Sequence, residues 1–137
     1  MTYETTLQRA SRRALAALMV TMGVLHFVAA DTFASIVPDY LPWHLPLVYL
    51  SGVAEAALGV LLLSEGSRWL AAWGCVALFV AVFPANIYWA MHPELQVAGL
   101  PKWLPQPTET ALWMRLPLQF LFIAWALQFT GRERRLR

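Results

Sequence analysis

The chain contains four apolar stretches that are each long enough to cross a lipid bilayer, and they restrict its fold more than any other feature. The stretches cover residues of about 14–30, 47–63, 69–91 and 111–129. Helices of these lengths rise about 26 to 35 Å, against a hydrocarbon thickness of roughly 30 Å. Backbone groups in lipid must be satisfied within the protein, and no short alternating segments indicate a β-barrel. The sequence therefore predicts an all-α, integral membrane four-helix bundle that forms one domain over residues 1–137.

Composition and charge support a membrane protein and give it an orientation. Only 13% of the 137 residues are charged, whereas soluble domains carry about 25%. One side of the predicted bundle has a single basic residue, Lys102, and the other has Arg9, Arg12, Arg13, Arg68, Arg132, Arg134, Arg135 and Arg137. This bias predicts a multi-pass protein of the plasma or bacterial inner membrane, with both termini and a basic tail (131–137) in the cytoplasm. It also explains the net positive charge of the chain, so no nucleic-acid partner is predicted. Membrane lipids are the expected surroundings.

Each apolar stretch also contains polar side chains that are costly in hydrocarbon. An ionisable group there costs roughly 3 kcal/mol, so such groups are expected to pair or to have a function. The candidates for ligand binding or proton handling are His26, Glu55, Asn86, Arg115 and Gln119. Counted from the span ends, they form a layer from mid-bilayer towards the outer face. Glu55 and Arg115 are the expected ion pair, which either cements the helices or belongs to a site that opens outward.

The sequence around Glu55 also predicts close helix packing. Ser51, Glu55 and Gly59 are spaced by four residues, and Gly52 lies beside this row. Small residues on one face of a membrane helix allow a partner helix to approach closely. We therefore expect a neighbouring helix to contact this face.

Metal and haem centres are not predicted. The three histidines lack the spacing that places two ligands on one helix face, and only His26 lies within a span. Cys75 is the single cysteine, so the chain has neither an internal disulfide nor a CxxC pair. Quinone is the one cofactor expected, and no haem, flavin or metal is.

Several sequence strings resemble the DoxX family of small four-helix membrane proteins. They are HFVAADTFASIVPDYLP (26–42), LVYLSGVAEAALGVLLL (47–63), AAWGCVALFVAVFPANIYWAMHP (71–93) and RLPLQFLFIAWAL (115–127). The resemblance covers nearly the whole chain after the first dozen residues and includes all five polar candidates. The family string HFxxPxxF reads HFVAADTF here, with Ala30 or Asp31 near the proline position. The name-giving relatives are linked to a thiosulfate:quinone oxidoreductase, so the resemblance implies association with a membrane oxidoreductase.

These observations favour a quinone-associated subunit of a membrane oxidoreductase that works with a partner protein. A quinone needs an apolar slot, hydrogen-bond partners for its oxygens and a route for protons, which the polar layer could supply. Two alternatives remain open. The same layer would suit a binder or transporter of a small lipophilic or acidic ligand, and the chain would also serve as a structural subunit or anchor. Apolar outer helix faces permit a homodimer.

Overall fold

The regular structure of the chain is a bundle of helices. The computed structural model describes residues 4–95 and 105–131, and within these residues it has no strand. The helices are α1 (Thr6–Val28), α2 (Ala30–Ala34), α3 (His44–Leu63), α4 (Arg68–Met91) and α5 (Glu109–Leu127). By length and composition, the four long helices could each cross a membrane. The all-helical, four-helix prediction is confirmed, and the short α2 is an addition to it.

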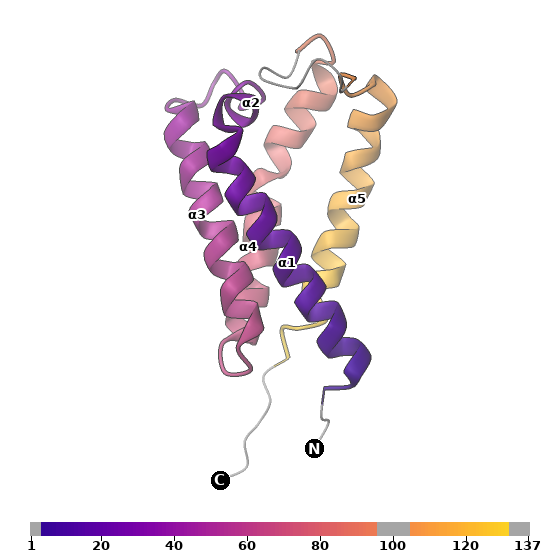
Figure 1. Cartoon of the computed structure of the whole chain (residues 1–137). Coiled ribbons are helices and arrows are strands. Elements are labelled where there is room, and N and C mark those ends of the chain that lie inside the picture. Colours follow the sequence, from indigo (N-terminus) through magenta and orange to yellow (C-terminus); the bar gives the residue numbers. More distant parts are fainter. Residues whose placement is uncertain (1–3, 96–104, 132–137) are drawn as a thin grey trace.

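The long helices run alternately up and down the bundle (Figure 1). The start of α1, the end of α5 and the turn between α3 and α4 lie at one end, called here the turn end. Helix α2 lies at the opposite end, called here the α2 end. Most of the predicted basic tail, residues 132–137, and Lys102 are outside the described residues.

Helix α1 begins well before the predicted residue 14, because a polar segment caps it. Thr5 Oγ1 accepts a hydrogen bond from the Gln8 amide at 3.2 Å, and Gln8 Oε1 accepts one from the Thr5 amide at 2.8 Å. This reciprocal capping box satisfies two amide groups that the first helical turn leaves open. The apolar stretch marked only the later part of the helix. The starts and ends of α3, α4 and α5 lie within three residues of the prediction.

Helices α1 and α3 approach each other through glycines. A Cβ atom added to Gly23 would lie 2.6 Å from the Ala56 backbone nitrogen, and one added to Gly52 would lie 2.7 Å from His26 Cβ. At Gly59, an added Cβ would lie 2.9 Å from the Ala16 carbonyl oxygen. The predicted close packing on this face of α3 is therefore confirmed, and the partner is α1.

The main apolar core fills the turn-end half of the bundle, and all four long helices contribute to it. Its buried members include Leu15, Met19, Leu62, Cys75, Phe79 and Ala126. A hydrogen bond from Trp125 Nε1 to Ser11 Oγ, 2.8 Å long, joins α5 to α1 at the same end. Nearer the α2 end, the buried cluster is smaller and consists of Trp89, Ala90 and Leu112 of α4 and α5.

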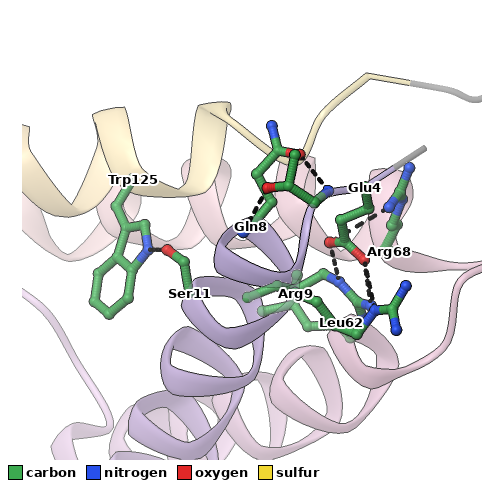
Figure 2. Close-up of polar contacts among 9 residues, drawn as sticks. Glu4, Gln8, Arg9, Ser11, Leu62, Arg68 and Trp125 are labelled. Carbon is green, nitrogen blue, oxygen red and sulfur yellow. Dashed lines mark hydrogen bonds and ion pairs between the residues drawn. The ribbon is translucent and has the colours of Figure 1, made fainter. Parts of the chain in front are cut away.

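A charged cluster around Glu4 ties three helices together at the turn end (Figure 2). Arg12 of α1 is buried and binds the Glu4 carboxylate twice, through Nε at 2.8 Å and Nη2 at 2.9 Å. Its Nη1 donates to the carbonyl oxygen of Leu62, which a helix end leaves without an intrahelical donor. Arg68, the first residue of α4, lies 3.4 Å from Glu4 Oε1. The cluster thus fixes α1 against α3 and α4.

Candidate functional site

The centre of the candidate site is a buried contact between His26 of α1 and Glu55 of α3. The two helices are antiparallel, and helical side chains lean towards the N-terminus of their own helix. His26 therefore leans away from the α2 end while Glu55 leans towards it, and the two meet. His26 Nδ1 lies 3.2 Å from Glu55 Oε2. Each residue is 8% exposed, so this pair is held inside the protein.

The hydrogen-bond partners of His26 define which atoms can exchange a proton. Nδ1 lies 2.8 Å from the carbonyl oxygen of Met22, one turn earlier in α1. A carbonyl can only accept, so Nδ1 carries a hydrogen in this contact. Glu55 Oε2 is buried and receives no hydrogen bond of regular geometry, although Nδ1 is nearby. The ring of His26 stacks on Phe33 of α2, with centroids 4.0 Å apart. The pair therefore presents a donor that is hydrogen-bonded to the Met22 carbonyl and, beside it, a carboxylate oxygen that can accept a hydrogen.

Asn86 and Gln119 form a separate pair between α4 and α5. Asn86 Nδ2 donates to Gln119 Oε1 at 3.2 Å, and Gln119 Nε2 donates to the carbonyl oxygen of Phe79 at 2.7 Å. Pro84 lies inside α4, where its missing amide interrupts the backbone hydrogen bonds. Both ends of the Gln119 amide are thus engaged. This pair links two helices, and its polar atoms do not join those of His26 and Glu55.

Arg115 does not form the expected ion pair with Glu55. Its guanidinium carbon lies 4.5 Å from the ring centre of Trp89, on α4. None of the acidic side chains in the described parts of the chain pairs with it. The prediction of a Glu55–Arg115 pair is wrong because α3 packs against α1 and α4, whereas α5 packs against α4. Glu55 accordingly finds its partner on α1.

The five predicted residues are therefore divided between the two sides of the bundle and do not form one cluster. Within residues 4–95 and 105–131, no group of three or more His, Cys, Asp or Glu side chains could hold a metal ion. Two residues that contact buried or charged side chains were not predicted from the sequence: Trp89, which packs on Arg115, and Glu4, which binds Arg12. Trp89 gave no signal, since tryptophan is frequent in this chain. Glu4 is the one acidic residue among the arginines that precede the first apolar stretch, and this could have indicated a partner for Arg12.

Comparison with known proteins gives a family but no activity. A family model described as a domain of unknown function (DUF8561) matches residues 15–130. The matched range includes all five polar residues of the candidate site and excludes Glu4 and Arg12. None of the curated proteins and none of the solved structures compared with the chain matches it.

Proposed function

The chain belongs to the DUF8561 family, and we propose that it is a multi-pass membrane protein whose His26–Glu55 pair exchanges a proton with a quinone. It would act as a subunit of a membrane oxidoreductase in the plasma or inner membrane. Four helices of sufficient length and apolarity support the membrane location. The arginine bias favours a cytoplasmic turn end, since positive residues collect on the cytoplasmic side of membrane proteins.

One observation carries the proposal: a histidine and a glutamate meet inside the glycine-packed, largely apolar part of the α1–α3 pair. Such groups are expensive in a membrane core and usually mark ion, proton or ligand pathways. None of the arginines in the described residues pairs with this carboxylate. Its partner is His26 at 3.2 Å, and histidine is the residue type that most often serves as a proton carrier in proteins. The DoxX-like strings around both residues favour the same class of function.

Oxidation of a quinol to a quinone releases two electrons and two protons. Glu55 Oε2 has no regular hydrogen bond, so it can accept the hydrogen of a quinol hydroxyl and then take that proton. His26 Nδ1–H can turn from the Met22 carbonyl to the carboxylate, which stabilises the charged form of Glu55 until it takes the proton. The second proton passes to solvent. Both electrons would pass to a redox centre of the flavin or haem class on a partner protein.

Retention of quinone by the purified protein tests the proposal. The full chain is extracted in mild detergent, and its co-purifying lipids are quantified by mass spectrometry for wild type, Glu55→Gln and Glu65→Gln. Glu65 is the matched control, because it is an exposed acidic residue in the turn after α3. We expect quinone in the wild type and the control and a clear loss in Glu55→Gln, with equal helix content by circular dichroism. Equal quinone in all three, or bulk phospholipid alone, would refute the proposal and favour a structural subunit.

A further inference from the structure

Arg115 and Trp89 together leave hydrogen-bond donors without acceptors on the α4–α5 side of the bundle. Arg115 is exposed, and no described acidic side chain neutralises it. Trp89 is 4% exposed, and its Nε1 is buried without a hydrogen-bond partner among residues 4–95 and 105–131. A buried polar group without a partner costs roughly 1 to 3 kcal/mol. The two residues are in direct contact, so a ligand group that binds the Arg115 guanidinium lies close to the Trp89 indole.

The position of this contact places it near the α2 end of the bundle. Trp89 lies two residues before Met91, the last residue of α4. Arg115 lies further along α5, but its side chain leans towards the N-terminus of that helix and hence towards the same end. Long basic side chains in membrane helices extend in this way so that the charged group reaches the interface. The guanidinium is therefore expected where polar groups of lipophilic molecules gather.

We propose that Arg115 and Trp89 bind an oxyanion at the end of an apolar chain, either the phosphate of an anionic phospholipid or the carboxylate of a fatty acid. The planar guanidinium offers several N–H groups that match the geometry of both oxyanions. The Trp89 N–H is buried in the structure, and the proposal requires the ring to turn so that this group supplies one further donor. Exposed Leu118, three residues after Arg115 and on the same side of α5, provides apolar surface beside the site.

This site differs from the His26–Glu55 pair in both location and chemistry. It lies between α4 and α5, and it requires a fixed positive charge, not a group that exchanges protons. The inference rests on the proposed membrane location of α5 but not on quinone binding. Loss of one site should therefore leave the other intact.

Lipid association measured by electron paramagnetic resonance tests the inference. The full chain is reconstituted in phosphatidylcholine vesicles that contain spin-labelled phosphatidylglycerol, stearate or phosphatidylcholine as the probe. We expect the wild type to immobilise an anionic label more strongly than labelled phosphatidylcholine. Because hydrogen bonds to charged groups are the stronger ones, Arg115→Gln should lower the relative association of that label at least about fivefold. The preferred label, phosphatidylglycerol or stearate, identifies the natural oxyanion.

Two further variants locate the effect. Trp89→Phe keeps an aromatic ring under the guanidinium and removes the N–H, so we expect about a twofold loss. Arg13→Gln removes the same charge from an exposed arginine near the turn end and should leave the preference unchanged. If Arg115→Gln kept the preference for the anionic label, or if Arg13→Gln lost it, the inference would be overturned. If Trp89→Phe kept the full preference, Trp89 would not be part of the site. If no label is immobilised at all, the membrane location itself is refuted, whereas immobilisation without anionic preference refutes this site alone.

Discussion

Replacement of Gly23 by alanine should force α1 and α3 apart and destabilise the fold by about 2 kcal/mol. The added Cβ would lie 2.6 Å from the backbone nitrogen of Ala56 and 2.7 Å from the carbonyl oxygen of Gly52. These backbone atoms move only if the whole of α3 moves. Overpacking of this kind costs about 1 to 3 kcal/mol. Alanine also favours a helix interior over glycine, but by at most about 1 kcal/mol, so the clash dominates.

Two other glycines provide controls with the same chemical change. At Gly74, the nearest atom to an added Cβ is Cδ2 of Leu58, the end of a flexible side chain. Rotation of that side chain relieves the contact, and the helix preference of alanine offsets the remaining cost. Gly66 lies in the turn between α3 and α4, where the nearest atom is Ser64 Oγ at 3.9 Å. Both alanine variants should stay within about 0.5 kcal/mol of wild type.

Reversible unfolding in mixed micelles measures these differences. Sodium dodecyl sulfate is titrated into the protein in mild detergent, and the loss of helix is followed by circular dichroism. Gly23→Ala should unfold at a clearly lower fraction of dodecyl sulfate than the Gly74 and Gly66 variants. If Gly23→Ala unfolded together with wild type, or if all three variants were equally destabilised, the backbone contact between α1 and α3 would be refuted.

The same assay tests three predictions about polar contacts. Arg12→Met should lower the free energy of unfolding by about 3 kcal/mol, because it leaves the Glu4 carboxylate and the Leu62 carbonyl without their donor. The control Arg13→Met should lower it by less than about 0.5 kcal/mol. The hydrogen bond from Arg12 holds the pKa of Glu4 below its ordinary value of 4.5. The stabilisation from Glu4 should therefore be complete above pH 4.5 and should be lost as the pH falls through the lower pKa of the folded state. Glu4→Gln should abolish this acid-induced loss of stability. If the variant were as sensitive to acid as wild type, this prediction would be contradicted. Gln119→Leu should cost about 1 kcal/mol by removing the donor to the Phe79 carbonyl, without reducing quinone retention.

Hydropathy predicted most of the fold, because an apolar stretch long enough to cross a bilayer predicts a helix of about the same length. It missed the start of α1, since the helix continues through a polar segment that Thr5 and Gln8 cap. It also missed α2, five residues long and outside the apolar stretches. The presence of the long helices therefore followed from the hydropathy pattern, whereas the position of a helix end depended on local hydrogen bonds.

The candidate site was only partly predictable for a related reason. The cost of polar groups in hydrocarbon identified His26, Glu55 and Arg115 as notable, but it does not say which helices are neighbours. The glycines of α3 indicated a close partner helix without identifying α1, and that choice decides which side chain meets Glu55. Charge alone favoured arginine as the partner. Helix packing instead places His26 beside Glu55, and Arg115 packs on the Trp89 ring.

Redox-induced infrared difference spectroscopy tests the central claim most directly. The protein is reconstituted with quinone, and an electrode replaces the redox centre of the partner. The account predicts a carboxyl C=O band that changes when quinol is oxidised and shifts in heavy water. The band should be present in wild type and Glu65→Gln and absent in Glu55→Gln. A band that persists in Glu55→Gln, or no carboxyl change in wild type, would contradict proton exchange at Glu55.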